Sequence, residues 1–174
     1  YPHIEIKSGR SGGSGPLLCI RRKFLMRVVL QRVSQARLSV AGEEAASIGP
    51  GLVAYVGFSS QDSIESMTYI LNKIWNLRVF EDENGKLNRS VIDMGYEILF
   101  VPNFTLYGDC RSGRRPSYSS GAPVEEARKL FEQFQGEASH GPVRAAFGVF
   151  QAEMEISQSC DGPVTLLLDS QKVF

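Results

Sequence analysis

The chain has 174 residues, 43% hydrophobic and 22% charged, an ordinary globular composition that is long enough for one domain with a substantial core. Its 19 basic and 19 acidic residues balance, which argues against a protein that grips long nucleic acid with a basic surface. The chain has two histidines, too few for a Ser-His-Asp hydrolase or a His-ligated metal site to be expected. Its three cysteines have no CxxC spacing, which argues against a zinc site or a disulfide framework and makes the cytoplasm the expected compartment. No apolar run approaches the ~20 residues of a membrane span.

The first 25 residues differ from the rest of the chain. Ser8–Pro16 is rich in Gly and Ser, and Arg21–Lys23 is a short basic cluster. We interpret residues 1–25 as a flexible N-terminal extension, a tag, a vector remnant or an overlong gene start, and residues 26–174 as the domain. Residues 26–174 contain 14 basic and 18 acidic side chains, so any contact with nucleic acid is expected to be local.

The next segment predicts three strands. Alternating polar and apolar residues favour a strand over Arg27–Val40, followed after Gly42 by a short return strand that ends at Ile48. Gly49-Pro50-Gly51 breaks the chain. Leu52–Phe58 contains no polar residue, which predicts a central strand covered on both faces.

The middle of the chain predicts a helix and then a hairpin. Asp62 or Ser63 can cap a helix whose buried stripe is spaced by three and four residues. After it, Asn84-Gly85 is typical of a hairpin turn between two strands. The predicted stripe is Ile64, Met67, Leu71 and Ile74, widened by Ile70 and Trp75, and the predicted strands are Leu77–Phe80 and Leu87–Ile92.

The last part predicts a second helix and two more strands. Pro123 suits the first turn of a helix that Gly136 can end, with a buried face of Val124, Ala127, Phe131 and Phe134. The predicted strands are Phe147–Ile156 and, after a break at Gly162-Pro163, Val164–Leu168. Several strands around two main helices predict a single compact layered α/β domain.

Glu97–Tyr118 is the stretch that the other elements surround. An apolar strand, Ile98–Val101, ends at Pro102-Asn103 because proline cannot donate to a sheet ladder. The strand therefore delivers an aromatic ring and a hydroxyl to its end, followed by three arginines, which suits chemistry on a phosphate-bearing ligand. A core strand that leaves through a solvated loop is the alternative. The ring, the hydroxyl and the arginines belong to Phe104, Thr105, Arg111, Arg114 and Arg115.

The chain closely resembles the D-aminoacyl-tRNA deacylase family over Met26–Phe174. The matching segments are MRVVLQRVSQA, IGPGL, NLRVFEDENGKLN, FTLYGD with GRRPS, and DGPVTLLLDS. The resemblance implies a homodimer of three-layer α/β/β subunits with mixed sheets, which hydrolyses the ester between a D-amino acid and the terminal ribose of tRNA. It implies tRNA as partner, an active site at the subunit interface, no cofactor or metal, and no DNA or membrane partner.

Two segments carry the site that the resemblance implies. Pro102–Leu106 stands where the family has SQFTL, and Cys160–Thr165 stands where it has NxGPxT. In the family a cis Gly-Pro reaches into the partner's pocket, where two carbonyls hold the α-amino group and exclude an L side chain. Glycine has no side chain to clash, so the resemblance also implies removal of glycine from alanine tRNA.

The chemistry fits a chain with few histidines. An aminoacyl ester is already activated, so positioning a water and stabilising the oxyanion can suffice. We expect the backbone N–H groups of Phe104 and Thr105 to be the donors. The Thr105 hydroxyl can orient the water or the ester, or the substrate's ribose 2′-OH can activate the water.

The remaining candidate residues have a functional and a structural interpretation. Arg32 is expected near the Gly-Pro segment or in a cross-strand ion pair; Met154 is pocket wall or core; Thr165 supports its own turn. The three arginines contact the tRNA backbone or form a solvated loop. The expected set for substrate binding and chiral selection is Gly162, Pro163, Pro102, Asn103, Arg32, Met154 and Thr165.

Two departures from the family pattern leave the substrate and the activity open. Pro102-Asn103 replaces Ser-Gln, and Cys160 replaces Asn beside the Gly-Pro. A related animal branch whose first motif also begins with Pro has a trans Gly-Pro and removes L-alanine from mischarged tRNA. An RNA-binding module without catalysis is a further possibility, and a metal-dependent hydrolase is disfavoured by the shortage of ligands.

Overall fold

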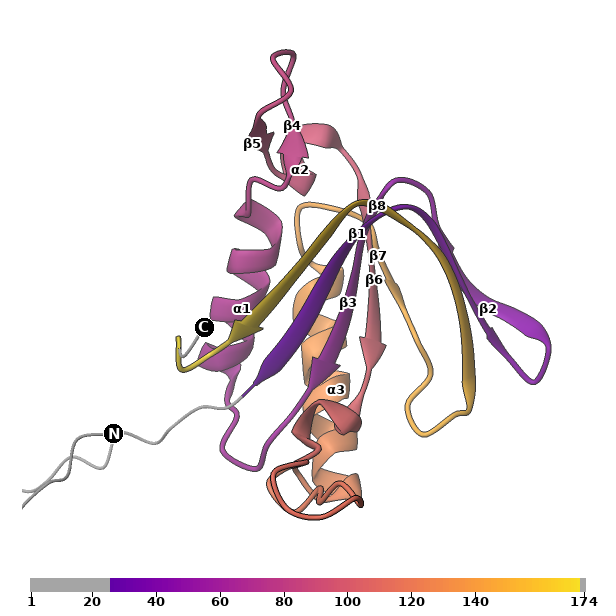
Figure 1. Ribbon diagram of the computed structural model, residues 1–174, viewed down its shortest axis with the longest axis vertical. Helices are drawn as coiled ribbons and strands as arrows, with labels where there is room; N and C mark the ends of the chain where they lie inside the picture. The colour runs from indigo at the N-terminus through magenta and orange to yellow at the C-terminus, as the bar shows by residue number, and fades with distance from the viewer. Residues whose placement is uncertain (1–25, 173–174) are drawn as a thin grey trace, which may run out of the picture.

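The structure is a computed structural model that describes residues 26–172 (Figure 1). The interpretation of residues 1–25 as an extension lies outside the described residues. None of the described helices is long and apolar enough to cross a membrane. In chain order the elements are β1 (Arg27–Val40), β2 (Glu43–Ile48), β3 (Gly51–Gly57), α1 (Ile64–Asn76), β4 (Phe80–Glu81), β5 (Leu87–Arg89), α2 (Val91–Met94), β6 (Glu97–Pro102), the 3₁₀ turn η1 (Phe104–Tyr107), α3 (Val124–Ser139), β7 (Ala145–Phe147) and β8 (Met154–Asp169).

One mixed sheet contains six of these strands. Its order is β2-β1-β3-β6-β7, and β8 pairs with β1 as well. The long strand β1 is antiparallel to β2, β3 and β8, whereas β6 is parallel to both β3 and β7. The N-terminal half of β1 therefore lies between β3 and β8, and its C-terminal half lies between β2 and β8. The remaining strands, β4 and β5, form a separate two-stranded ribbon.

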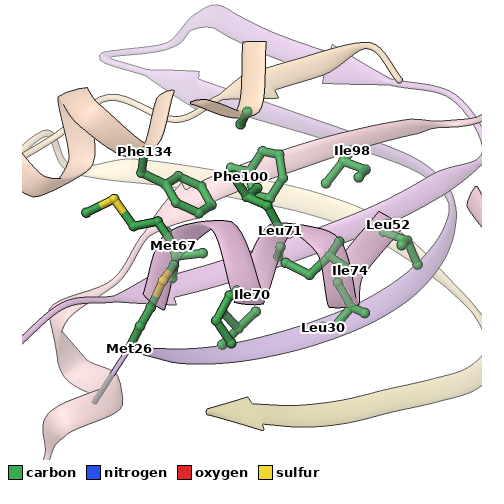
Figure 2. Close-up of a cluster of buried hydrophobic side chains, with 14 of the residues drawn as sticks. Met26, Leu30, Leu52, Met67, Ile70, Leu71, Ile74, Ile98, Phe100 and Phe134 are labelled. Atoms are coloured by element: carbon green, nitrogen blue, oxygen red, sulfur yellow. The ribbon is translucent and has the colours of Figure 1, made fainter. Parts of the chain in front are cut away.

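The central strands separate two hydrophobic cores, which explains why the β3 sequence lacks polar residues. On one face, alternate residues of β3 and β6 pack against α1 and α3 (Figure 2). On the other face, Val53 and Leu99 belong to a second cluster with Leu38 of β1 and Ile48 of β2. The sheet thus curls so that β1, β2 and β8 cover β3 and β6 (Figure 1). The helices, the central strands and the curled strands form three layers, but the expected separate mixed sheets are one continuous sheet.

Helix α1 follows its predicted stripe with one exception. Ser63 is its N-cap residue, and the Ser63 N–H donates to Ser66 Oγ at 3.0 Å. Met67, Ile70, Leu71 and Ile74 are buried, as predicted, and face the first core (Figure 2). The prediction is wrong for Ile64, the first residue of the helix, which is 54% exposed.

The hairpin is shorter than predicted because a helix cap interrupts it. The predicted strand over Leu77–Phe80 is reduced to β4, and the predicted return strand ends at Arg89. Ser90 then caps α2: the Ser90 N–H donates to Asp93 Oδ2 at 2.8 Å, and the Asp93 N–H donates to Ser90 Oγ at 3.2 Å. Ser-x-x-Asp is a recognisable capping signal. The turn at Asn84-Gly85 is confirmed, with a left-handed φ of +71° at Gly85.

Four of the C-terminal predictions are wrong. Helix α3 continues past Gly136 to Ser139, because Ala138 is still buried in the first core. At its start Val124 is half exposed instead of buried. The predicted strand Phe147–Ile156 is interrupted over residues 148–153, and Gly162-Pro163 does not end a strand but lies within β8.

Candidate active site at the end of strand β6

The η1 turn, by which we mean Asn103–Tyr107, forms where β6 leaves the sheet. Pro102 is the last residue of β6 and pairs with Val56 of β3. The Asn103 N–H still donates to the Val56 carbonyl at 2.7 Å, after which the chain turns into the 3₁₀ helix. The buried strand therefore fixes the point at which the turn begins.

The side chain of Asn103 caps this turn. Its Oδ1 accepts hydrogen bonds from the Thr105 N–H at 3.1 Å and from the Thr105 hydroxyl at 2.5 Å. The first N–H groups of a helix have no partner within the helix. Among residues 26–172 the Phe104 N–H has no hydrogen-bond acceptor, so it is the donor that a ligand can reach.

Close packing from β3 and β1 holds the η1 turn in place. A Cβ added at Gly57 would lie 3.0 Å from both the Asn103 carbonyl oxygen and Tyr107 Cε2, so a larger residue here would force the turn or the ring to shift. Tyr107 is buried, and this burial raises the pKa of its hydroxyl. Arg27 lies over the Tyr107 ring at 4.9 Å and donates to the Leu106 carbonyl at 3.0 Å.

A cavity of about 490 Å³ opens beside the η1 turn, and most of its surface is apolar. Phe104, which is 67% exposed, stands at its edge and contacts Tyr118 edge to face, with ring centroids 5.1 Å apart. The far wall comes from the start of α3 and the loop before β8. The lining includes Pro102, Asn103, Phe104, Tyr118, Ala122, Pro123, Val124, Ala127, Phe150 and Gln151.

The three arginines lie on an exposed loop, residues 109–117, which follows η1. Asp109 and Ser117 close the loop with reciprocal backbone hydrogen bonds of 2.8 and 3.0 Å. Arg111 folds back onto Asp109, with its Nη2 2.6 Å from Asp109 Oδ2, and this guanidinium holds the pKa of the Asp109 carboxyl well below its usual range. Arg114 and Arg115 are exposed at the tip. The loop thus places two guanidinium groups in solvent near the site.

The Gly162-Pro163 bulge, residues 161–164, lies within the second expected segment, Cys160–Thr165. Cys160 pairs with Val33 and Thr165 with Gln31, so these four residues of β8 lie opposite Arg32 alone. The Gly162-Pro163 peptide bond is cis, and both residues are exposed.

Arg32 supports this bulge from beneath. It is only 6% exposed and donates to the carbonyls of Val79 at 2.7 Å and Asp161 at 3.2 Å. Its Nε also lies 3.0 Å from Asp161 Oδ2. A Cβ at Gly162 would be 3.1 Å from Arg32 Nη2. Arg32 therefore forms a cross-strand ion pair and also contacts the Gly-Pro segment.

The two segments do not meet within one chain. Arg32, opposite the bulge, pairs with Leu52, whereas Pro102 pairs with Val56. Four residues along β3 and three strand spacings separate them, on the order of 15–20 Å. In Figure 1, η1 follows the lower end of β6 and β8 bends at the opposite end of the sheet.

The last two expected residues lie elsewhere. The Thr165 hydroxyl accepts a hydrogen bond from Gln31 Nε2 at 3.3 Å, away from the η1 turn. Met154 packs on the second core; a Cβ at Gly148 would lie 2.9 Å from its sulfur and 3.1 Å from Pro102 Cδ. Met154 therefore lies close to Pro102, the last residue of β6.

Sequence reasoning missed much of the cavity. Tyr118 and Phe150 line it from loops, where nothing in the local pattern separates them from other aromatic residues. Gly57 could have been noticed as a glycine at the end of an apolar strand, which often marks a close backbone approach. Within residues 26–172 no group of three or more His, Cys, Asp or Glu side chains could hold a metal ion.

Comparison with known proteins gives a consistent result. Residues 29–169 match the family model described as D-Tyr-tRNA(Tyr) deacylase. The D-aminoacyl-tRNA deacylases of Thermosipho africanus and Desulfitobacterium hafniense are each 49% identical over 149 residues, which cover 86% of this chain and all of the relative.

Two solved structures have a similar fold. The c-Myc DNA Unwinding Element Binding Protein is 37% identical, with a TM-score of 0.76 over 82% of this chain and 97% of its own. A probable eukaryotic D-amino acid tRNA deacylase is 19% identical, with a TM-score of 0.70 over 83% of this chain and 99% of its own. The second likeness concerns the fold alone.

Proposed function

The chain belongs to the D-Tyr-tRNA(Tyr) deacylase family, and we propose that it hydrolyses the ester bond of D-aminoacyl-tRNA. The products are the free D-amino acid and tRNA, so the reaction is a proofreading step that acts after aminoacylation, in the cytoplasm. The observation that carries the proposal is the unpartnered Phe104 N–H beside an apolar cavity at the end of β6.

The Phe104 N–H stabilises the oxyanion in this proposal. When water attacks the ester carbonyl, negative charge develops on the carbonyl oxygen, and a donor already in place stabilises it without reorganisation. One such donor is worth about 3 kcal/mol. The Thr105 N–H can add a second bond only by sharing with Asn103 Oδ1, which already accepts from it. No protein general base is required if the ribose 2′-OH of the substrate accepts the proton of the water and passes its own proton to the 3′-oxygen that leaves.

The cavity receives the terminal adenosine of the tRNA. Its aromatic rings, Phe104, Tyr118 and Phe150, suit a base, because stacking a base on an aromatic side chain contributes ~1–3 kcal/mol without hydrogen-bond readout. A base in this cavity would place the aminoacyl ester on the ribose next to the Phe104 N–H, which lies at the cavity edge.

A second copy of the chain supplies the chiral filter. The Gly162-Pro163 bulge is exposed and lies on the order of 15–20 Å from the η1 turn of its own chain. It can therefore approach such a turn only in a partner, which makes the functional unit a homodimer with sites at the interface. Its carbonyls hold the α-amino group, and its backbone leaves no room for an L side chain. Glycine passes this filter, so glycine attached to alanine tRNA is also a substrate.

The exposed loop contacts the tRNA backbone. Arg114 and Arg115 are solvent-exposed at its tip, whereas Arg111 is bound to Asp109. Since acidic residues outnumber basic ones over residues 26–174, attraction to phosphates is local to this loop. DNA is not a substrate, because the scissile ester is on a ribose and DNA carries none, and the reaction involves no membrane.

One experiment separates deacylation of D-aminoacyl-tRNA from L-alanyl editing and from RNA binding without catalysis. The full chain is incubated with D-tyrosyl-, L-tyrosyl-, glycyl- and L-alanyl-tRNA, and ester loss is followed. Fast loss of the D-tyrosyl and glycyl esters with L-tyrosyl-tRNA spared is the expected result. Loss of the L-alanyl ester instead would indicate an L-alanyl editing enzyme. Pro102 and Cys160, the departures from the family pattern, would then mark that change of substrate. Binding of tRNA without loss of any ester would indicate an RNA-binding module and refute the enzyme.

A further inference from the structure

We propose that Arg128 of α3 binds the 5′-phosphate of the terminal adenosine of the tRNA, at the wall of the cavity that lies opposite the η1 turn. The inference rests on the deacylase function proposed above and adds a residue to its substrate-binding site. Arg128 lies outside Pro102–Leu106 and Cys160–Thr165, the two segments that carry the expected site.

Arg128 reaches the cavity through two of the residues that line it. Its guanidinium carbon lies 5.0 Å from the centroid of the Phe150 ring, and its Nη2 donates to Gln151 Oε1. Phe150 and Gln151 both line the cavity, and so does Ala127, the residue before Arg128 on the helix. These contacts hold a guanidinium beside a cavity whose described lining residues carry no charge.

The guanidinium of Arg128 has N–H groups left for a ligand, because its one bond to Gln151 uses only part of its donors. On α3, Glu125 and Glu132 stand three residues before it and four residues after it, the spacings at which helical ion pairs form. Arg128 nevertheless takes part in none of the ion pairs among residues 26–172. The side chain is directed toward the loop before β8, where its free donors can meet an anion.

The loop before β8 holds this side chain in one direction. Gln151 has a left-handed φ of +60°, which is uncommon for a residue with a side chain. Such a backbone persists only where the surrounding structure supports it, and it is frequent at ligand clamps. The Phe150 ring is supported too, since it stacks on Phe131 of α3 with ring centroids 6.0 Å apart. Arg128 therefore loses less side-chain freedom when it binds a ligand than a free surface arginine would.

The chemistry of the ribose places a phosphate on this side of the cavity. The 3′-oxygen carries the amino acid and the 5′-oxygen carries the phosphate, and the two project from opposite sides of the sugar. With the ester next to the Phe104 N–H and the base inside the cavity, the 5′-phosphate faces the wall formed by α3 and the loop before β8. A planar guanidinium matches two phosphate oxygens at once. Arg128 therefore sets the direction in which the terminal nucleotide enters.

Titration calorimetry of the full chain with adenosine 5′-monophosphate and with adenosine measures the phosphate contact apart from catalysis. Wild type should bind the monophosphate about tenfold more tightly, the size of one hydrogen bond to a charged group. Arg128→Gln, which keeps an amide but removes the charge, should bind both compounds equally and should bind adenosine as wild type does. Lys129→Gln is the matched control, because it removes one charge from an exposed position of the same helix and should keep the preference.

Kinetics with D-tyrosyl-tRNA connect the contact to the proposed substrate. KM should rise about tenfold in Arg128→Gln, while kcat changes less than about threefold, because the phosphate is bound equally before and during the reaction. In Lys129→Gln, KM should stay within about threefold of wild type.

Each outcome has a distinct meaning. If wild type binds the two compounds equally, or if Arg128→Gln keeps the preference for the monophosphate, the phosphate contact is refuted and the deacylase function stands. If Arg128→Gln loses adenosine binding to the same extent, Arg128 only supports Phe150 and Gln151, which also refutes the contact. Weaker binding of the monophosphate with an unchanged KM would assign the site to free nucleotides and overturn its role toward tRNA. If wild type hydrolyses none of the esters, the deacylase function fails, and the role of Arg128 in it fails whatever the titrations show.

Discussion

The η1 turn and the Gly162-Pro163 bulge are both irregular backbone segments next to sheet strands, but different contacts hold them. The η1 turn is capped by Asn103, two residues from Thr105. The bulge is held by Arg32, which is 129 residues away from Asp161 in the chain and nearly buried. A local cap depends on neighbouring sequence, whereas the bulge depends on the completed sheet. The two segments should therefore respond differently to substitution.

The largest expected effect is on the bulge. Arg32→Met removes a buried guanidinium and leaves the Val79 carbonyl without its donor, so the free energy of unfolding should fall by ~3 kcal/mol. Chemical denaturation measures this loss. Because its bulge is loosened, the Arg32→Met variant should also hydrolyse L-tyrosyl-tRNA faster relative to D-tyrosyl-tRNA. Arg37→Met, which removes an exposed ion pair with Glu44, is the control and should cost less than ~0.5 kcal/mol. Equal losses in both variants would mean that burial of Arg32 is irrelevant.

The next effect is on the packing beneath the η1 turn. Gly57→Ala inserts a methyl group 3.0 Å from the Asn103 carbonyl and from the Tyr107 ring, which should lower stability by ~2 kcal/mol. Since the turn must shift, kcat for D-tyrosyl-tRNA should fall about 100-fold while the ratio of D to L hydrolysis is kept. Gly49→Ala meets no atom within 4 Å and should behave as wild type. A normal kcat in Gly57→Ala would contradict the role of the turn.

Gly162→Ala should have a smaller effect on stability and a selective one on chirality. Gly162 has a φ of +118°, and an added Cβ would lie 3.0 Å from the Val164 nitrogen, so the expected loss is ~1–2 kcal/mol. Gly85→Ala provides a matched control, because its φ is +71° with open space around it. The D-to-L ratio should change only in Gly162→Ala. A change of the same size in Gly85→Ala would exclude the bulge as the filter.

The smallest effect on stability is expected from the exposed loop, residues 109–117, which belongs neither to the η1 turn nor to the Gly162-Pro163 bulge. Replacing Arg114 and Arg115 together by Gln should change the free energy of unfolding by less than ~0.5 kcal/mol, because both are exposed. It should raise KM for tRNA and lower the dependence of KM on salt, with kcat unchanged. Titration of KM against ionic strength checks this. An unchanged salt slope would remove the loop from the tRNA interface.

Much of the fold was predictable because its signals are local. Period-two alternation located β1, and the absence of polar residues in β3 indicated burial on both faces, which the two cores confirm. Three- and four-residue spacing located α1. Most errors lie at the ends of elements. Helix α3 continues past Gly136, because tertiary burial of Ala138 outweighs the ~1 kcal/mol cost of a helical glycine.

The sequence by itself determined β1, β3 and α1, the end of β6 at Pro102-Asn103 and the resemblance to a deacylase family. Only the tertiary structure decided that one sheet curls to form both layers, that Tyr118 and Phe150 share a cavity with Phe104, and that Arg32 lies beneath Gly162. These contacts join residues far apart in the chain. Their existence depends on the register of β1 against β3 and β8, which is set by burial of the whole sheet rather than by any local pattern.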